Sequence, residues 1–535
     1  MTNSEIADKL KLTANLLELL DDNPFKIKSL LNASFKIDKL DIDLHGLSQI
    51  EIESIDGIGK GIATKINELN QTATTTELQE LLHRIPVGVI QMMDIKGIGP
   101  KKVALLWKQL GIESPGELLY ACNENRLIEL KGFGEKTQTA IRKSIEFNLS
   151  NEGKFLYAEI EAEAYSLLSK LQQQFPNDLF AYAGDFIRKM EIIESLELLT
   201  SKKDLDLSEI RSMAAVAIEL TVVNAANFGC ELFLRSGSKE FLNAFADNYS
   251  QLENCAREED IFEINNLPYI MPSLRESSRI IELAQNQQLN QLVKLEDIKG
   301  IFHVHSKYSD GAATIKELAE TVRKKGMHYI GITDHSRSAF YANGLSADRV
   351  LQQHQEIDTL NNALSTFKIF KGIESDILND GNLDYEDDIL KQFDFVIASV
   401  HSVLKMDIER ATQRLIKAIE NPYTTMLGHM TGRLLLSREG YPLHKQKIID
   451  ACAANNVIIE LNANPYRLDI DWRLIHSCTD KGVMISINPD AHSIAGLDDI
   501  KYGIYVAQKG LLKVDMCFNA QDLSVVQKVF NAKVK

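Results

Sequence analysis

The sequence has few cysteines and no long run of apolar residues, and both absences restrict what the protein can be. Its six cysteines, at positions 122, 230, 255, 452, 478 and 517, are far apart and never adopt C-x-x-C spacing. This argues against thiolate zinc fingers and predicts the reduced thiols of a cytoplasmic protein. No apolar run is long enough to span a bilayer, and the acidic, amphipathic start "MTNSEIADKLKLTANLLELL" is unlike a signal peptide. We therefore expect no membrane partner.

The chain also lacks an excess of basic residues, because 59 Lys and Arg stand against 75 Asp and Glu, a net charge of −16. Spread evenly, this charge would disfavour nucleic acid. Over residues 1–145, however, acidic and basic residues nearly balance, so the excess acid lies further along and local motifs must decide the partner. A chain of 535 residues should also contain several domains, since one core rarely grows beyond about 250–300 residues.

A glycine-containing segment occurs three times in the N-terminal part, as "SIDGIGKGIATKI" (54–66), "DIKGIGPKKVALL" (94–106) and "ELKGFGEKTQTAI" (129–141). In each, two glycines permit a tight turn between helices, and the turn amides with the following helix start can hold an anion. Three copies with lysine in one register favour binding to the DNA backbone. The alternative is three plain helical packings that use glycine only to turn. The expected DNA-binding residues are Gly57, Gly59, Lys60, Lys65, Gly97, Gly99, Lys101, Lys102, Gly132, Gly134 and Lys136.

Seven strand-like apolar runs alternate with amphipathic stretches after residue 299. The runs are 300–305, 329–335, 369–377, 393–401, 424–430, 457–465 and 483–492. Alternation of this kind predicts parallel strands with crossover helices, and seven of them predict a closed or nearly closed barrel. In the first run, "GIFHVH", alternation along a strand would place His303 and His305 on one face.

Polar side chains follow where these runs end, and the carboxyl ends of barrel strands share one rim. The set contains six of the twelve histidines and comprises His303, His305, Asp310, His335, Glu374, His401, His429, Asp490 and His492. Imidazoles and carboxylates together suit metal ions. We therefore predict a metal centre at this rim.

These motifs, "HVHSKYSDG", "GITDHS", "GIES", "SVH", "GH" and "NPDAH" in this order, resemble a PHP (polymerase and histidinol phosphatase) domain. The resemblance implies phosphoester hydrolysis by two or three divalent ions (manganese, zinc, magnesium or iron) held by the nine side chains. In that picture Glu374 bridges two ions, and Glu374, Asp490 and His305 are the ligands expected to act in catalysis. Arg433 and Arg467 follow the fifth and sixth runs, where they would either orient a phosphate or be solvated at the surface.

Nearly the whole chain resembles the bacterial family-X DNA polymerases, often called PolX. Besides the glycine segments, "MPSLRESSRIIELAQ" and "LVKLEDIKGIFHVHS" are typical of that family. The family's palm reads approximately A-G-S-x-R-R, then G-D-I-D, then V-D-L-R, and its aspartates hold magnesium. The matching stretches here are "AGDFIRKMEIIESLELLT" (183–200) and "AIELTVVNAANFGCELFLRSGSKE" (217–240).

In those stretches the family's catalytic aspartates are replaced by Ser195, Glu197 and Glu219. Serine brings no charge to magnesium, and glutamate displaces its oxygens by about 1 Å. Asp185 replaces the serine that would contact the triphosphate, and Leu234 and Arg235 stand where the family has a Tyr-Phe pair. We therefore expect a polymerase fold that has lost its metal site.

Lys65 matches the position at which eukaryotic relatives of the family carry a lysine that forms a Schiff base with an abasic sugar. Such a lysine needs a depressed pKa from desolvation or from neighbouring cations. The companion lysine position is Gly61 here, so that cation is missing. Phosphate binding is the role we favour for Lys65.

The expected protein is multidomain, of the α and α/β classes. We expect an all-α helix–hairpin–helix region (1–80 and 81–150), a polymerase-X-like α+β palm and thumb (151–285), a linker (286–298) and a PHP (β/α)7 barrel (299–535). The expected function is a monomeric, metal-dependent nuclease that trims the 3′ ends of gapped or nicked DNA in repair. The alternatives are a gap-filling polymerase with a weakened metal site, and a phosphatase of small molecules on a DNA-binding scaffold.

Overall fold

The computed structural model describes all residues except 39, 41, 96, 129, 151–152, 206–215, 250–253, 365 and 534–535, and omits the side chains of 147–150. Residues 96 and 129 fall within the second and third glycine segments and so lie outside this description. The chain divides into two compact units, the first of residues 1–123 and 127–146, the second of residues 124–126 and 147–535. Among the described residues, no helix combines the length and apolar character needed to cross a membrane.

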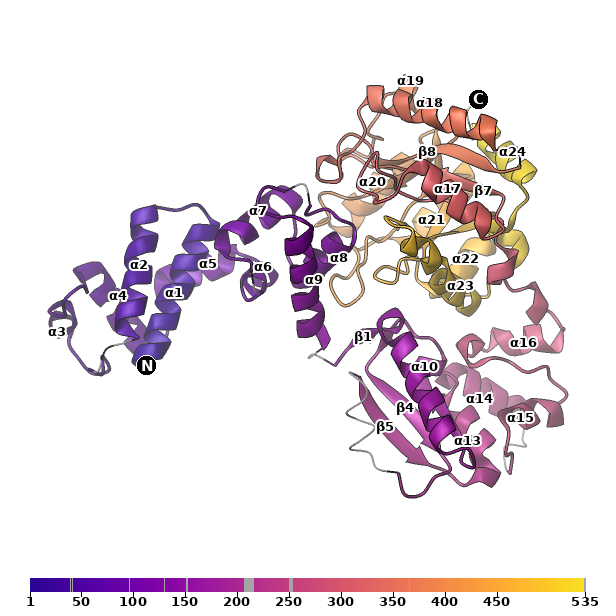
Figure 1. The fold of residues 1–535 in the computed structure, drawn as a ribbon, viewed down its shortest axis with the longest axis horizontal. Helices are drawn as coiled ribbons and strands as arrows, with labels where there is room; N and C mark the ends of the chain where they lie inside the picture. Colours follow the sequence, from indigo (N-terminus) through magenta and orange to yellow (C-terminus); the bar gives the residue numbers. More distant parts are fainter. Residues whose placement is uncertain are drawn as a thin grey trace. The chain divides into compact units, whose positions relative to one another are not determined.

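The first unit is built of helices, indigo to purple in Figure 1. They are α1 (Asn3–Leu19), α2 (Pro24–Ile37), α3 (Gln49–Glu53), α4 (Lys60–Thr72), α5 (Thr76–Arg84), α6 (Val87–Met92), α7 (Pro100–Leu110), α8 (Pro115–Asn123) and α9 (Glu135–Ser150). Buried apolar residues recur on the inner faces of the long helices, for example Leu10, Ala14 and Leu17 of α1. This spacing of three to four residues gives each helix one apolar side for the core.

The three glycine segments fold alike. The first glycine of each, Gly57, Gly97 or Gly132, has a φ between 78° and 92°, which a residue with a Cβ rarely adopts. The helix then starts directly after the second glycine, at Lys60, Pro100 or Glu135. The prediction of an all-helical region of glycine hairpins is confirmed.

The second unit contains a seven-stranded parallel sheet whose strands follow one another in chain order, β6 to β12. The strands are β6 (Gly300–Ile301), β7 (Tyr329–Ile332), β8 (Lys368–Asp376), β9 (Phe395–Ser399), β10 (Thr424–Leu427), β11 (Ile458–Asn462) and β12 (Ile485–Asn488). A bridge between Val304 and Ala491 joins the first strand's extension to the last one's, so the barrel is nearly closed. The predicted seven-stranded barrel is confirmed.

The strands end before the histidines that follow them, which differs from the expected runs. β6 ends at Ile301, and His303 has a φ of 57°, outside the strand region. The strand alternation that we used to place His303 and His305 on one face therefore does not hold. The chain instead leaves the strand conformation at the rim, and both side chains still belong to one cluster.

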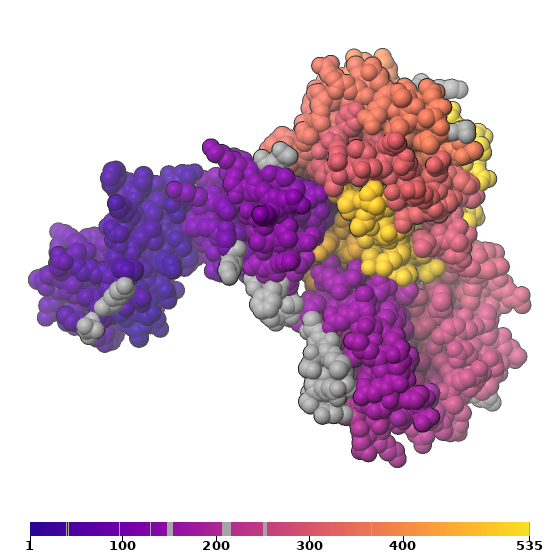
Figure 2. Space-filling model, in the orientation of Figure 1, coloured from indigo at the N-terminus to yellow at the C-terminus, as the bar shows by residue number. Residues whose placement is uncertain are grey.

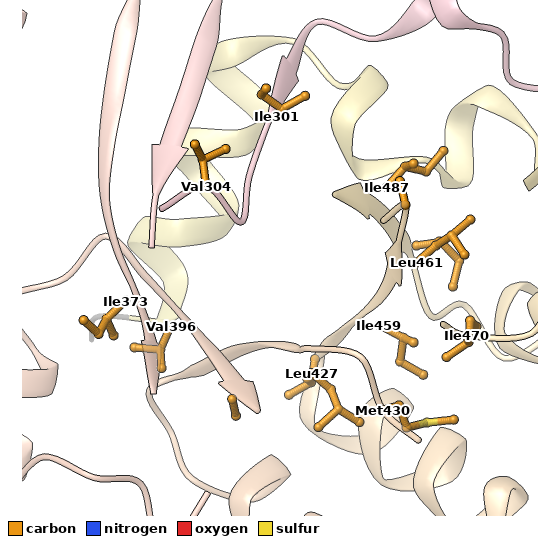
Figure 3. Packing of buried hydrophobic residues seen from close by; sticks show 14 of the residues in the cluster. Ile301, Val304, Ile373, Val396, Leu427, Met430, Ile459, Leu461, Ile470 and Ile487 are labelled. Atoms are coloured by element: carbon orange, nitrogen blue, oxygen red, sulfur yellow. The ribbon is translucent and has the colours of Figure 1, made fainter. Parts of the chain in front are cut away.

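Amphipathic helices surround the barrel: α17 (Ile315–Lys324), α18 (Ala347–Ala363), α19 (Asp387–Leu390), α20 (Ile408–Ile419), α21 (Lys445–Asn455), α22 (Trp472–Thr479) and α23 (Ile500–Lys509). Thr314 caps α17 and pairs reciprocally with Glu317. The apolar core between strands and helices includes Ile373 of β8, Val396 of β9 and Ile459 of β11 (Figure 3).

The last helix, α24 (Leu523–Lys533), closes the end of the barrel where the strands begin. Its Phe530 stacks on Phe395 with the ring centroids 4.8 Å apart, and Phe302 and Phe370 belong to the same aromatic cluster. The yellow residues of the C-terminus lie directly against barrel residues in the space-filling view (Figure 2). The end where the strands terminate is thus left for polar groups.

A smaller α+β region precedes the barrel within the second unit. Its three-stranded sheet has the order β2 (Phe180–Ala183), β4 (Ser195–Thr200) and β5 (Ala217–Val222), with β4 and β5 parallel. Its other elements are β1 (Phe155–Leu156), α10 (Tyr157–Gln174), α11 (Gly184–Ile187), β3 (Ile192–Ile193), α13 (Phe228–Arg235), α14 (Lys239–Asn248), α15 (Glu258–Ile264) and α16 (Arg279–Gln285).

One buried lysine links this region to the barrel. Lys509, at the end of α23, is 1% exposed, and its ammonium donates to the carbonyl of Arg188 and lies 3.7 Å from Glu276. A buried cation requires such partners, because desolvation without compensation is costly. Lys509 thereby holds α23 against the α+β region.

Candidate metal centre at the barrel rim

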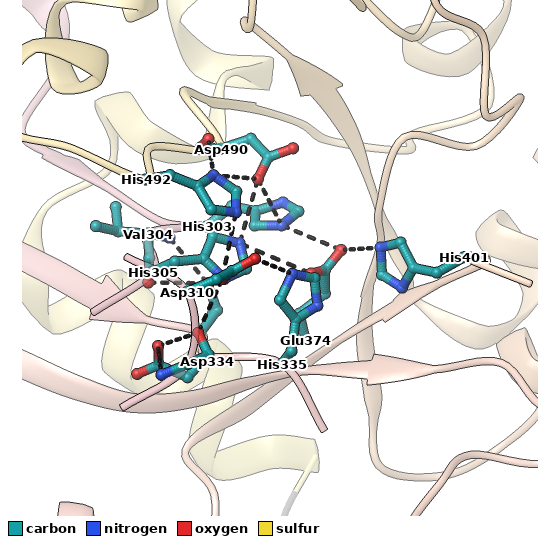
Figure 4. Close-up of polar contacts among 12 residues, drawn as sticks. His303, Val304, His305, Asp310, Asp334, His335, Glu374, His401, Asp490 and His492 are labelled. Atoms are coloured by element: carbon teal, nitrogen blue, oxygen red, sulfur yellow. Dashed lines mark hydrogen bonds and ion pairs between the residues drawn. The ribbon is translucent and has the colours of Figure 1, made fainter. Parts of the chain in front are cut away.

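All nine predicted ligands lie at the rim of the barrel, on or just after six of its seven strands. His303, His305 and Asp310 follow β6, and His335 follows β7. Glu374 belongs to β8, His401 follows β9, and His429 follows β10. Asp490 and His492 follow β12 (Figure 4). We refer to these nine side chains as the cage.

Glu374 lies at the centre of the cage. Its Oε1 is 2.9 Å from His429 Nε2, 3.1 Å from His401 Nε2 and 3.2 Å from His303 Nε2. Its Oε2 is 3.0 Å from His335 Nδ1. Because both oxygens face imidazole nitrogens on different sides, this carboxylate has the position of a ligand shared between ions.

A second group of ligands surrounds Asp310. Its carboxylate lies 3.5 Å from His492 Nε2 and 3.6 Å from His335 Nε2, and His305 belongs to the same four-residue cluster. The rings of His305 and His492 stack at 4.1 Å. His305 also reaches Asp490 Oδ1 at 3.2 Å, so it connects this group with the side of the cage that holds His303.

The cage is buried, yet many of its polar atoms have no hydrogen-bond partner. His303 and His305 are fully buried, and Glu374 is 1% exposed. Within the described part of the chain, both nitrogens of His305 and His335, Oε2 of Glu374 and Oδ1 of Asp490 have no hydrogen-bond partner. Buried polar atoms are almost always satisfied, so this density of unsatisfied donor atoms fits bound cations.

The pKa values of the cage residues are shifted in different directions. Burial, with the neighbouring imidazoles of His492 and His335, lowers the pKa of His305 to about 3. Burial would also lower the pKa of His401, but the carboxylates of Glu374 and Asp376 outweigh it and raise that pKa to about 9. The histidines hold the pKa of Glu374 well below its usual value against the effect of burial. The carboxylates are thus charged and ready to bind cations.

Carboxylates outside the cage orient its histidines, and sequence reasoning missed them. Glu460 of β11 is fully buried and lies 2.5 Å from His303 Nδ1. It also accepts from the amide of His429 at 2.7 Å and from Asn488 at 2.8 Å. Asp376 pairs with Nδ1 of His401. A signal existed, since "VIIELNANP" places an acid inside a strand too apolar to leave it unpaired.

Asp334 holds the loop that carries the first three ligands. It accepts hydrogen bonds from the amides of Ser306 and Ser309, from both of their hydroxyls and from Gln353. This network fixes the loop between His305 and Asp310, and it explains the acid of "GITDHS" as a positioning residue.

Neither of the two arginines flagged for a phosphate is solvated at the surface. Arg433 donates to the carbonyls of Arg467 and Leu468 and pairs with Asp471 at 3.0 Å. Arg467 is 3% exposed, with its Nε 3.6 Å from Asp490. Arg433 therefore braces a loop, whereas Arg467 lies beside a cage ligand.

The α+β region contains the other predicted acids. Glu197 of β4 and Glu219 of β5 are register partners, whereas Ser195 pairs with Ala217. Arg235 Nη1 lies 3.9 Å from Glu197. Burial, together with Glu219 and Asp185, raises the pKa of Glu197. The structure brings Asp185, Glu197 and Glu219 near one another, without histidine and without charge at position 195.

The Asp185 side chain is already engaged. It pairs with Arg188, whose guanidinium also contacts Glu276 at 3.0 Å. Leu234 is 44% exposed on α13. Arg188 is thus already paired with two acids of the chain itself.

The hairpin lysines fall into two classes. Lys60, Lys101 and Lys136 are exposed beside their turns, and Lys101 also lies 3.7 Å from Glu18. Lys102 donates to the carbonyl of Gly97 at 3.2 Å and lies over the ring of Phe133. Lys65 lies 2.5 Å from Glu77, which also pairs with Lys26. A Cβ added at Gly59, Gly99 or Gly134 would meet nothing within 4 Å, so the turn amides are accessible.

Comparisons with known proteins match both units. A PHP domain model matches residues 302–464, a helix-hairpin-helix domain model matches residues 1–75, and a SAM-like helix-hairpin-helix tandem model matches residues 89–146. The DNA polymerase/3′-5′ exonuclease PolX of Bacillus subtilis is 32% identical over 98% of this chain and 99% of its own length. A probable phosphatase of a Thermoanaerobacter species is 28% identical over 43% of this chain and 94% of its own. A probable phosphatase of Acetivibrio thermocellus is 26% identical over 36% of this chain and 78% of its own.

Proposed function

The chain belongs to the bacterial PolX family of family-X DNA polymerases, and from that premise we propose that its PHP domain is a 3′–5′ exonuclease acting on DNA. The observation that carries the proposal is the cage, in which Glu374 and eight further buried or partly buried side chains come together. Two or three divalent ions of manganese, zinc, magnesium or iron would activate water and neutralise the phosphate oxygens as charge develops.

The residues of the site would have different roles. Glu374 and Asp490 supply negative charge to the ions, and the histidines supply neutral donors that keep the net charge of the loaded cage low enough for an anionic substrate. Glu460 and Asp376 fix the rings of His303 and His401, so the ligands are oriented before substrate arrives. Arg467 lies beside Asp490, and this position supports a contact to a phosphate.

DNA would be held by the glycine hairpins. The open turn amides and the exposed Lys60, Lys101 and Lys136 support contacts to the phosphate backbone that do not depend on base identity. Lys65 is less suited to this role because Glu77 already pairs with it. Gapped, nicked or 3′-ended DNA is the proposed partner, and a monomer is the proposed state.

The α+β region would bind a DNA end without adding nucleotides. Ser195 brings no charge, and Asp185 repels a triphosphate and pairs with Arg188. One observation favours the alternative of residual polymerase activity, namely that Glu197 and Glu219 lie directly opposite each other on parallel strands. Primer extension with magnesium or manganese decides between the two: extension by the intact chain that Glu219→Ala abolishes would establish a polymerase.

The test of the nuclease is the degradation of 5′-labelled single-stranded and gapped DNA with manganese. We expect a ladder of shortening products from the intact chain and none from His303→Ala/His305→Ala. The same ladder from both proteins would contradict the proposal. Hydrolysis of small phosphomonoesters with no effect on DNA ends would instead place the chain with the probable phosphatases it matches over the barrel.

A further inference from the structure

The loop that follows His335 is firmly built and lies beside the cage. It contains the short helix η5 (Phe340–Ala342) and ends at α18. The amide of Leu345 donates to the carbonyl of His335 at 2.9 Å, and Arg349 donates to the carbonyl of Asn343 at 2.8 Å. Asn343 closes the turn with a φ of 54°. Because both ends of the loop are hydrogen bonded, the backbone of η5 is held in place.

Tyr341 of this loop packs against His335, a ligand of the cage. Its ring lies 6.2 Å from the ring of His335, edge to face. The hydroxyl oxygen is buried, and no described residue hydrogen bonds to it. The guanidinium of Arg126 lies over the same ring, 4.8 Å from its centroid. A buried proton donor without an acceptor therefore lies on a side chain that is next to a cage ligand.

Phe340, the preceding residue, has the opposite environment. Its side chain is 72% exposed, although the ring packs edge to face on Tyr341 at 5.9 Å. An isolated exposed apolar residue is ordinary. This one, however, is an aromatic ring one residue from a tyrosine that packs against the cage, which is the arrangement that a nucleobase stacked outside a phosphate site would need.

We propose that Phe340 and Tyr341, here called the aromatic turn, recognise the terminal nucleotide: Phe340 stacks on its base, and the Tyr341 hydroxyl donates a hydrogen bond to the phosphate that is hydrolysed. This inference rests on the proposed nuclease function. Stacking tolerates every base because each has an aromatic face. The aromatic turn therefore selects nucleic acid over small phosphoesters without selecting sequence.

The test of Phe340 uses two DNA strands that differ only in whether the terminal 3′ nucleotide carries a base, the second ending in a tetrahydrofuran abasic nucleotide. With the full chain and manganese, we expect Phe340→Ala to lower kcat/KM about ten-fold on the normal end. On the abasic end the same variant should differ from wild type by less than about two-fold, and Phe340→Trp should behave as wild type on both. Val525→Ala, which removes an exposed apolar side chain from α24, is the matched control.

The test of Tyr341 is Tyr341→Phe, which keeps the ring and removes the hydroxyl. We expect kcat to fall about ten-fold on both DNA ends, with the metal content of the purified protein unchanged. An unchanged kcat overturns the role of the hydroxyl. Equal losses by Phe340→Ala on normal and abasic ends, or no loss on either, overturn base stacking while wild type still degrades DNA. If wild type degrades neither end, the proposed nuclease itself fails, which is a separate result.

Discussion

The second unit contains two places where acidic side chains from different strands come together, and only one of the two is equipped to hold metal ions. At the barrel rim, Glu374 is surrounded by imidazoles from four other strand ends. On the small sheet, Glu197 and Glu219 face each other with an arginine nearby and a serine in place of a third acid. Adjacent carboxylates therefore do not make a metal site. Burial, the number of ligands and buttressing residues such as Glu460 distinguish the two places.

The largest expected effect comes from neutralising the central acid of each place in turn. Glu374→Gln should abolish bound metal and lower DNA hydrolysis about 1,000-fold, roughly 4 kcal/mol of transition-state stabilisation. Glu219→Gln, on the small sheet, should change neither the bound metal nor the rate of DNA hydrolysis by more than about two-fold. Elemental analysis and the ladder assay measure the two quantities. Similar losses from both variants would show that the two acid clusters work together.

A smaller effect should follow from loosening a ligand without removing it. Glu460→Gln weakens the buttress on His303, so metal affinity should fall about 10- to 100-fold, and activity should return at higher manganese. The exposed Glu282→Gln on α16 serves as the control and should titrate with manganese as wild type does. Activity that stays low at saturating manganese would mean that Glu460 acts on the reaction rather than on the metal.

The link between the two regions should be visible in the pH dependence of stability. Burial lowers the pKa of Lys509 from 10.5 to about 8. Between these values the unfolded chain binds more protons than the folded one, so this contribution to stability is present above pH 10.5 and is lost as the pH falls through 8. Between pH 8 and 9.5, the free energy of unfolding of wild type, measured with denaturant, should rise by about 2 kcal/mol relative to that of Lys509→Met. A difference in the free energy of unfolding that stays constant over this pH range would contradict a buried, charged Lys509.

The smallest expected effect concerns binding rather than cutting. Lys60→Ala/Lys101→Ala/Lys136→Ala should weaken binding to double-stranded DNA about ten-fold at moderate salt and reduce the salt dependence of the affinity. Lys102→Ala is the contrasting variant, because that lysine already bonds to a turn carbonyl and should matter for packing instead. Unchanged affinity in the triple variant would remove the hairpins from the proposed interface.

The sequence was sufficient for the parts of the fold that are encoded by repetition. Gly57, Gly97 and Gly132 recur with the same neighbours, and the apolar runs after residue 299 alternate with helices, so hairpins and barrel were both predictable. The positions of the ligands at strand ends followed from the rule that parallel strands share one rim. The ligands that come together at the rim could thus be predicted, because they follow the strands in chain order.

The remainder depends on contacts between distant residues that no local pattern records. His303 has a left-handed backbone at the rim, so the strand alternation from which we inferred the direction of its side chain does not apply. The partnership of Glu460 with His303 spans 157 positions, and the pairing of Lys65 with Glu77 depends on how two helices pack. Tyr341 lacks any motif, and only its unsatisfied hydroxyl distinguishes it.

The bridge between Val304 and Ala491 is where the barrel's first and last strands meet, and the residues on either side of it are His303 and His305. The amide of His305 donates to the carbonyl of Ala491, and the amide of Ala491 donates back to the carbonyl of His303. Two of the backbone hydrogen bonds that close the barrel are therefore made by His303 and His305, whose imidazoles also belong to the cage. Removing metal ions with a chelator should therefore act first at this bridge. We expect faster amide hydrogen exchange at His305 and Ala491, while the amides on the opposite side of the barrel stay protected.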